Sequence, residues 1–554
     1  MGTIKNGMQI NLFDILENSD SVSLEIEKDT TSIDSISDCD KNRFDNYCLD
    51  YYCKDVNEFG LKYVWDKINF YVLNYESNNT FLNTANFGEL YEIGLALIDK
   101  QQKKNSGQYY TPEDVAYIMS SWFNKLNAEN ICDVACGTGK LILTYLDILG
   151  RENAIKLISE GKLYLYDLDG VALSICKTII LKKYGKELAL KIHDVHCDFL
   201  DKRITLPENC KVISNPPYAA VSKILPNWNG TDVSYNTKEL YSMFMEKIIT
   251  QSKASVIITP YSFIGGNKFY SLRLLMNEYN GFIVSFDNVP GNIFCGRKHG
   301  IFNTNTSNSV RAAITVVENN NNHKGFRLTP LIRFKNEERK KLLVCEVLEE
   351  FISNKYQLVD KNNTSFSKCH KELQDIYETW LQKSDKTVKD ILVANKNKFS
   401  IYMPNTCRYF TTASSKELKR TGMMTLFARD ESMFNFLYCL INSSFVYWWW
   451  RIFDGGITYP IGLLNKLPIF DNLLTEDDKS FFANIVSQMV NVENDCIVTK
   501  LNAGTVQENI KFPSEYRNKI NQRLLKILGF TNINSSIFDV VHKNSVFGGI
   551  EEHD

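Results

Sequence analysis

The tetrapeptide Asn215-Pro216-Pro217-Tyr218 carries the residue types that most directly indicate chemistry. Two successive prolines cannot continue a ladder of strand hydrogen bonds or open a helix normally, so they fix a stiff, extended turn. The Asn215 side-chain oxygen and the Pro216 carbonyl can both accept from one –NH₂ group, and Tyr218 offers a face on which a planar ring can stack. The tetrapeptide therefore predicts a holder for a planar substrate that bears an amino group.

A glycine turn lies upstream, in NICDVACGTGKLILTYLDIL. Gly137 and Gly139 let the backbone turn sharply and approach a ligand closely. The helix that follows directs free N–H groups at this turn. The spacing is neither that of a phosphate-binding P-loop nor that of the dinucleotide fingerprint. Taken alone, the loop is equally explained as a tight strand-to-helix turn.

Acidic residues follow the next two expected strands. A carboxylate after the second strand suits the vicinal hydroxyls of a ribose, with Asp167 as the candidate and Asp169 as the alternative. Asp169 is better explained as a helix N-cap. After the third strand, Asp198 could accept from an exocyclic amino group, and Phe199 could pack on an adenine ring.

Short apolar runs alternate with helix-length segments from about residue 105 to 318, which predicts a doubly wound α/β sheet. The expected strands are 130–134, 163–166, 192–195, 212–214, 255–259, 283–287 and 312–317. The expected helices are 140–149, 171–184 and 240–251. Each of the chemical segments above thus follows the carboxyl end of a strand.

DVACGTG, the later acid, CDF and NPPY together resemble the amino-group methyltransferases that use S-adenosylmethionine. Upstream, Gly107–Pro112 (GQYYTP) resembles a segment of the DNA adenine-N6 methyltransferases. The cofactor motif precedes the catalytic motif and a large region follows both, as in the gamma class of that family. The resemblance implies a Rossmann-like methyltransferase sheet.

The resemblance also implies roles for individual residues. Asn215, Pro216, Pro217 and Tyr218 would hold a flipped adenine, with Phe294 stacking on its other face and Phe302 competing for that role. The residues expected to contact S-adenosylmethionine are Tyr110, Thr111, Pro112, Asp133, Ala135, Gly137, Gly139, Asp167, Asp198 and Phe199. The expected reaction is direct in-line transfer of the methyl group to the adenine amino nitrogen, with no metal and no covalent intermediate.

Charge and composition divide the chain into three expected regions. Residues 1–104 form an acidic, mainly helical N-terminal region: the first hundred residues hold 8 Lys and Arg against 18 Asp and Glu. Residues 105–318 form the catalytic domain, and a run of four asparagines at 319–322 marks its end. Residues 319–554 form a mixed α+β domain that recognises the DNA target, because residues 321–420 hold 20 Lys and Arg against 12 Asp and Glu.

Two basic segments of this last region are the expected phosphate contacts, Lys324–Lys341 and Arg408–Gly422. Further on, FNFLYCLINSSFVYWWWRIF resembles a recurrent segment of recognition domains in this class. Three successive tryptophans, Trp448–Trp450, cannot all point the same way, so one is expected at the surface.

Three alternatives remain open. A protein glutamine methyltransferase shares NPPY, but more than 200 residues after the sheet do not fit one. A fusion with a nuclease needs a D…E-x-K site, which the first hundred residues do not show. The modification subunit of a Type I system would fit the helical N-terminus, but it would leave recognition to a partner. The partners expected are double-stranded DNA and a cognate restriction endonuclease, with no membrane.

Composition bears on compartment and metal binding. The start of the chain has no signal-peptide pattern, and 14 cysteines occur without a CxxC pair, as expected of reduced thiols in a cytoplasmic protein of bacterial or phage type. His193, His196 and Cys197 match no standard zinc spacing.

Overall fold

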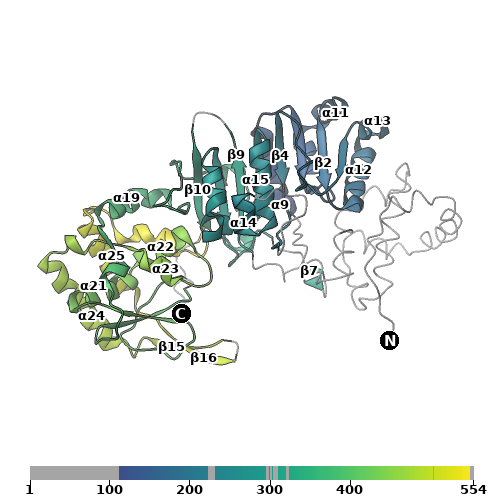
Figure 1. The fold of residues 1–554 in the computed structure, drawn as a ribbon. Coiled ribbons are helices and arrows are strands. Elements are labelled where there is room, and N and C mark those ends of the chain that lie inside the picture. Colours follow the sequence, from purple (N-terminus) through teal and green to yellow (C-terminus); the bar gives the residue numbers. More distant parts are fainter. Residues whose placement is uncertain are drawn as a thin grey trace, which may run out of the picture.

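The computed structural model of the chain describes Tyr91 and residues 111–221, 231–294, 298–299, 302–303, 310–319, 323–407, 409–502 and 504–548. The expected helical region 1–104 therefore lies outside the described residues except for Tyr91. Figure 1 shows a large sheet with helices on it, and a second group of helices gathered at the edge formed by β10 (Gly325–Ile332).

Eight strands form one sheet in the order β10-β6-β9-β5-β4-β1-β2-β3. All neighbouring pairs are parallel except those that β9 makes with β5 and β6. The strands are β1 (Asn130–Val134), β2 (Leu163–Asp167), β3 (His193–His196), β4 (Cys210–Ser214), β5 (Ala254–Pro260), β6 (Asn280–Phe286), β9 (Ala312–Val317) and β10 (Gly325–Ile332). A separate two-residue pair joins β7 (Lys298–His299) to β8 (Phe302–Asn303). This is the doubly wound α/β architecture that the sequence predicts.

Helices cover both faces of the sheet because side chains of successive strand residues point to opposite faces. On β1, Ile131 packs into the cluster under α9, α10 and α12, whereas Cys132 and Val134 pack on the opposite face under α15 and α16. The helices of this part are α9 (Glu113–Lys125), α10 (Lys140–Leu149), α11 (Arg151–Ser159), α12 (Gly170–Tyr184), α13 (Lys186–Ala189), α14 (Asp232–Thr237), α15 (Leu240–Gln251) and α16 (Tyr270–Met276). Two short 3₁₀ turns, η1 (Tyr261–Ile264) and η2 (Asn267–Phe269), precede α16.

The sheet continues past the asparagine run at 319–322. β10 pairs in parallel with β6, and Phe326, Leu328 and Leu331 on it are buried. The sheet layer therefore extends to Ile332, and the chain leaves it later than the sequence predicts.

The C-terminal part is a mixture of helices and two-stranded sheets, as expected. Its helices are α17 (Arg339–Leu342), α18 (Cys345–Glu349), α19 (Gln374–Lys383), α20 (Val388–Ile391), α21 (Glu431–Ile441), α22 (Ser444–Phe453), α23 (Ile461–Asn465), α24 (Glu476–Val492), α25 (Ser514–Ile527) and α26 (Asp539–His542). Its strand pairs are β11 (Lys386–Thr387) with β14 (Pro468–Ile469), β12 (Ser400–Pro404) with β13 (Met423–Phe427), and β15 (Ile497–Asn502) with β16 (Thr505–Ile510).

The expectation of a surface tryptophan in α22 is wrong. Trp448, Trp449 and Trp450 are 0%, 6% and 1% exposed. A helix can be buried on all sides when other elements surround it. Aromatic rings from α19 and from the segment between α25 and α26 pack around α22. Trp380 stacks on Trp448, and Phe538 meets the same ring edge-on. The tryptophans therefore form the core of the C-terminal part.

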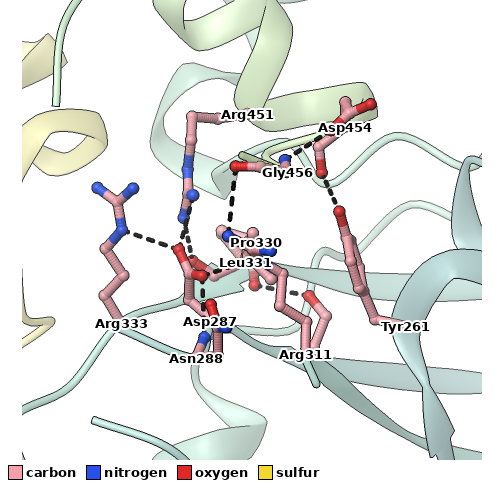
Figure 2. A network of polar contacts seen from close by, with 11 residues as sticks. Tyr261, Asp287, Asn288, Arg311, Pro330, Leu331, Arg333, Arg451, Asp454 and Gly456 are labelled. Atoms are coloured by element: carbon pink, nitrogen blue, oxygen red, sulfur yellow. Dashed lines mark hydrogen bonds and ion pairs between the residues drawn. The ribbon is translucent and has the colours of Figure 1, made fainter. Parts of the chain in front are cut away.

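One buried carboxylate joins the sheet to the C-terminal part (Figure 2). Asp287, directly after β6, accepts from Arg311 Nε at 2.8 Å, from Arg333 Nε at 3.0 Å and from Arg451 Nη1 at 2.8 Å. Arg451 belongs to α22 and also donates to the Leu331 carbonyl at 3.0 Å. Burial by itself raises the pKa of Asp287, but the three guanidinium groups hold this pKa below its usual range.

Candidate active site

The predicted site lies where the strand order of the sheet reverses. β1 leads outward to β2 and β3, whereas the chain returns to place β4 on the other side of β1. Ligands bind in such crevices at the carboxyl ends of the strands. Val134 pairs with Ser214 at these ends, so the glycine loop and the NPPY segment leave the sheet side by side.

The structure brings the TP segment and the NPPY segment into contact, although they are 104 residues apart. Asn215 donates from Nδ2 to the Thr111 hydroxyl oxygen at 3.0 Å. Because the nitrogen of the amide is used in this way, the side-chain oxygen is the acceptor that Asn215 can present to a substrate amino group. Thr111 is buried, and the next residue, Pro112, is the N-cap of α9. The start of this helix therefore holds the Thr111 hydroxyl that orients the Asn215 amide.

Tyr218 and Phe294 also come together, from the loops after β4 and β6. Their ring centroids are 5.9 Å apart at an interplanar angle of 66°, and the Tyr218 hydroxyl donates to the Ile258 carbonyl at 3.1 Å. The rings meet edge to face rather than lying parallel, so a base inserted between them would have to part them. The competing candidate, Phe302, lies in β8.

Arg339 anchors the loop that carries Phe294, a role that the sequence did not indicate. Its guanidinium donates to the Asn292 and Ile293 carbonyls, both at 2.7 Å, and to Asp114 in the first turn of α9 at 2.9 Å. One arginine thus ties the Phe294 loop to the helix that begins at the TP segment. Arg339 and Arg333 both lie in the basic segment 324–341. Each forms an ion pair within the protein, Arg339 with Asp114 and Arg333 with Asp287.

The glycine loop turns sharply through residues in the left-handed region of the backbone. Ala135, Gly137 and Gly139 have φ values of +58°, +53° and +87°. A Cβ at Gly139 would lie 2.3 Å from Cys176 Sγ, whereas a Cβ at Gly137 would meet nothing within 4 Å. The first glycine therefore faces open space at the mouth of the crevice, and the second is packed against α12.

This difference predicts unequal losses of stability for two alanine substitutions. Gly137→Ala should cost about 1–2 kcal/mol of stability, since alanine is strained in the left-handed region. If this loop binds S-adenosylmethionine as the sequence predicts, the added methyl group should also weaken that binding by filling the open space. Gly139→Ala should add overpacking of about 1–3 kcal/mol against Cys176 to the same strain. Thermal unfolding and calorimetric titration of both variants check this. Equal cofactor affinity in Gly137→Ala and the wild type would contradict the assignment of the open space.

Asp133 lies beneath the glycine loop. It is fully buried and accepts from the Ile142 N–H at 3.1 Å, one of the free N–H groups in the first turn of α10. Its other oxygen has no hydrogen-bond partner among the described residues, and burial raises its pKa well above the ordinary value. Asp133 therefore holds the start of α10 in place.

Asp167 links the second strand to the glycine loop. Its carboxylate accepts from the Gly137 N–H at 2.6 Å and from the Asp169 N–H at 2.7 Å. Burial raises the pKa of Asp167 to about 6, although these two backbone hydrogen bonds lower it. A carboxylate has about four lone-pair sites, so Asp167 keeps acceptor capacity for a hydroxyl group beside these backbone contacts.

Asp169 is the helix N-cap, as its alternative reading predicts. It accepts from the Val171 and Ala172 N–H groups at the start of α12. The Tyr91 hydroxyl donates to its other oxygen at 2.6 Å. Tyr91 is buried, so this one described residue of the N-terminal region lies at this edge of the site, a contact that the sequence did not indicate.

Asp198 and Phe199 lie in the turn after β3. The Asp198 side chain is exposed and accepts from the Leu200 N–H at 3.0 Å. The Phe199 ring is 3% exposed and packs edge-on against Tyr166 and near Phe244. Asp198 is therefore accessible to solvent, whereas the Phe199 ring is buried among its aromatic neighbours.

The remaining predictions concern Tyr110, a metal site and a membrane-spanning helix. Tyr110 lies outside the described residues. In the part of the chain that the structure describes, no group of three or more His, Cys, Asp or Glu side chains is placed to hold a metal ion. His193 and His196 contact the carbonyls of Gly161 and Leu168 instead. None of the described helices is long and apolar enough to cross a bilayer.

The fold is a doubly wound α/β sheet, and the predicted site residues lie at the carboxyl ends of its strands, where the strand order reverses. The family model described as N-6 DNA Methylase matches residues 83–402, and the chain belongs to this family.

Relatives with curated names lie in Type I restriction systems. The EcoEI methylase subunit of Escherichia coli is 28% identical over 227 residues, covering 39% of this chain and 45% of that protein. The MpnII methylase subunit of Mycoplasma pneumoniae is 22% identical over 353 residues, covering 60% and 58%. The chain thus spans about half the length of the curated relatives it matches. A solved DrdV–DNA complex aligns at a TM-score of 0.40 with 14% identity, over 61% of this chain and 44% of that one, and no function is inferred from it.

Proposed function

We propose that the protein is a DNA adenine methyltransferase. It transfers a methyl group from S-adenosylmethionine to the N6 amino group of an adenine flipped out of double-stranded DNA. The observation that carries this proposal is the Asn215 amide, held by Thr111 at the point where the sheet reverses, beside the glycine loop. Family membership supports the same chemistry.

The residues around the crevice fit S-adenosylmethionine. The open space at Gly137 gives room for a ligand against the backbone, and Asp167 has acceptor sites left for the ribose hydroxyls. Asp198 would accept from the adenine amino group. When bound, the cofactor supplies an electrophilic methyl group on a sulfonium.

The chain's own residues would hold the acceptor base. The Asn215 oxygen and the Pro216 carbonyl accept from its amino group and stabilise the positive charge that forms on the nitrogen as the N–CH₃ bond forms and the S–CH₃ bond breaks. The departing proton passes through one of these hydrogen bonds to solvent. Tyr218 and Phe294 would stack on the base and offset part of the few kcal/mol that unstacking costs.

The C-terminal part, residues 319–554 in the sequence-based division, would recognise the DNA target. Because Arg333 and Arg339 are used inside the protein, the segment Arg408–Gly422 is the better candidate for phosphate contacts. The protein would work where cellular DNA is, in the cytoplasm of a bacterium or an infected cell, together with a cognate restriction endonuclease.

A second candidate function is the modification subunit of a Type I system. Both curated relatives are methylase subunits of Type I restriction enzymes, which favours it. In this case the chain would bind cofactor and hold adenine as described, but a separate specificity subunit would select the DNA sequence.

The experiment that tests the proposal is incubation with radiolabelled S-adenosylmethionine and either DNA or protein acceptors. Label in DNA from the protein alone supports the first candidate. Label in DNA only after a specificity subunit is added supports the second. Label in protein glutamine and none in DNA would overturn both.

The raised pKa of Asp167 predicts how cofactor affinity depends on pH. The ribose needs the ionised carboxylate, so protonation below about pH 6 removes the acceptor sites. Affinity for S-adenosylmethionine should be constant above pH 7 and fall about tenfold from pH 7 to pH 5. Asp167→Asn should bind more weakly with no such fall. Calorimetric titration across this range checks it, and a flat wild-type profile would contradict the role of Asp167.

A further inference from the structure

Two buried lysines in the catalytic part have similar surroundings but bind different segments of the chain. Lys247 on α15 is 3% exposed, and Lys211 on β4 is 4% exposed. Each ammonium donates to two backbone carbonyls and lies over a phenylalanine ring. Burying an ammonium is costly unless it is well paired, and burial lowers the pKa of both lysines. The backbone carbonyls that each ammonium binds therefore indicate which segment that lysine stabilises.

Lys211 holds the end of a helix. It donates to the Phe123 and Leu126 carbonyls, both at 2.9 Å, at the C-terminus of α9. A cation at a helix C-terminus is favourable because the last carbonyls have no partner within the helix. Lys211 stands near the amino end of β4, at the opposite end of this strand from the Asn215 turn.

Lys247 binds the turn after β3, which carries Asp198 and Phe199, the residues predicted to contact the adenine of the cofactor. It donates to the Phe199 carbonyl at 2.5 Å and to the Asp201 carbonyl at 2.8 Å, and its ammonium lies 4.7 Å from the centroid of the Phe199 ring. Within the turn, the Asp201 N–H donates to the Asp198 carbonyl at 3.0 Å. The lysine therefore fixes the backbone on which the exposed Asp198 carboxylate stands.

α15 also connects this turn to the amino-group holder. The Leu240 N–H, at the start of the helix, donates to the Ala219 carbonyl at 2.9 Å, one residue beyond NPPY. The helix thus contacts the segment after Asn215 at its beginning and the 198–201 turn through Lys247.

We infer that Lys247 is a positioning residue that fixes the turn after β3 and thereby sets the affinity for the adenine half of the cofactor. The inference rests on the proposed function, because it takes Asp198 as the acceptor for the cofactor's adenine. Lys247 does not touch the reacting atoms, so it acts on binding and leaves the methyl-transfer step alone.

The test compares Lys247→Met with Lys211→Met, which removes an equally buried lysine from the amino end of β4. The probes are S-adenosylmethionine and 5′-methylthioadenosine, which keeps the adenine and ribose but lacks the amino-acid part. Lys247→Met should raise the dissociation constant of both probes by the same factor, about tenfold, for two lost charge-assisted hydrogen bonds. At saturating cofactor its turnover should stay within about twofold of the wild type.

Lys211→Met should lower thermal stability but leave both dissociation constants within about twofold of the wild type. The inference is overturned if Lys247→Met binds both probes as the wild type does, or if Lys211→Met loses as much affinity. If Lys247→Met does not fold, Lys247→Gln replaces it, and wild-type affinity there overturns the inference equally. Failure of the wild type itself to bind either probe would instead overturn the proposed cofactor, and this inference with it.

Discussion

Replacement of Asn215 by alanine is expected to lower methyl transfer by about 10²–10³-fold, while the affinity for S-adenosylmethionine stays within a factor of about two. The loss has the size found when one preorganised hydrogen-bonding group is removed from a developing charge. The binding of cofactor is retained because its candidate contacts, Gly137, Asp167 and Asp198, lie on other loops. Single-turnover transfer of label, measured beside a calorimetric titration of the cofactor, checks both halves of this expectation.

Two further variants complete the experiment. Thr111→Val removes the acceptor for Asn215 Nδ2 but keeps Asn215 itself, so its loss of turnover should be smaller than that of Asn215→Ala. Asn130→Ala is the matched control, since Asn130 stands at the amino end of β1 and donates to the Glu208 carbonyl at 2.7 Å. It should turn over normally. Near-normal transfer by Asn215→Ala would remove the proposed role of the NPPY segment.

Replacement of Asp287 by alanine is expected to destabilise the protein by about 3–5 kcal/mol, the cost of leaving buried charges without their partner. Three arginines, Arg311, Arg333 and Arg451, converge on this one carboxylate (Figure 2). Without it, they would repel one another in a site that excludes water. Chemical denaturation measures the change, and a loss below about 1 kcal/mol would contradict the account.

Arg451→Met is the control for this prediction, because it leaves Asp287 paired with two arginines. It should cost less than Asp287→Ala. The lowered pKa of Asp287 also fixes the sign of its pH dependence: its contribution is fully present above the ordinary aspartate pKa of about 4 and is lost as the pH falls toward the lowered value. Acid unfolding of Asp287→Ala should therefore lack part of the wild-type stability change below about pH 4.

The sequence predicts the catalytic sheet well because its strands are buried apolar runs with clear ends. β1 and β9 begin and end at the predicted residues, as do α10 and α15. The site residues could be placed for the same reason: each follows the carboxyl end of a strand, and parallel strands bring these ends to one edge.

The errors concern charged and aromatic residues whose partners are distant in the chain. The basic composition of residues 324–341 suggested a surface segment. Yet β10, within this segment, is a buried strand, and Arg333 binds Asp287, 46 residues earlier. The three tryptophans of α22 suggested one exposed side, but Trp380 and Phe538 arrive from other elements to cover them. Local pattern carries no information about such contacts.

The same limit applies to residues that support the site. Lys247, Arg339 and Tyr91 were not among the predicted site residues, and each contributes through a contact to a distant segment. Lysine and arginine are usually exposed, so in sequence they look like surface residues. Only the fold reveals that these side chains hold the loops of the site.

The central claim is that this chain methylates the amino group of adenine in DNA through Asn215. The most direct test is nucleoside analysis, by mass spectrometry, of DNA from cells that express the wild type or Asn215→Ala, each with the specificity subunit where one is required. We expect N6-methyladenine with the wild type and its absence with the variant. Methylation of cytosine, equal N6-methyladenine with both proteins, or unmodified DNA together with labelled protein glutamine would contradict it.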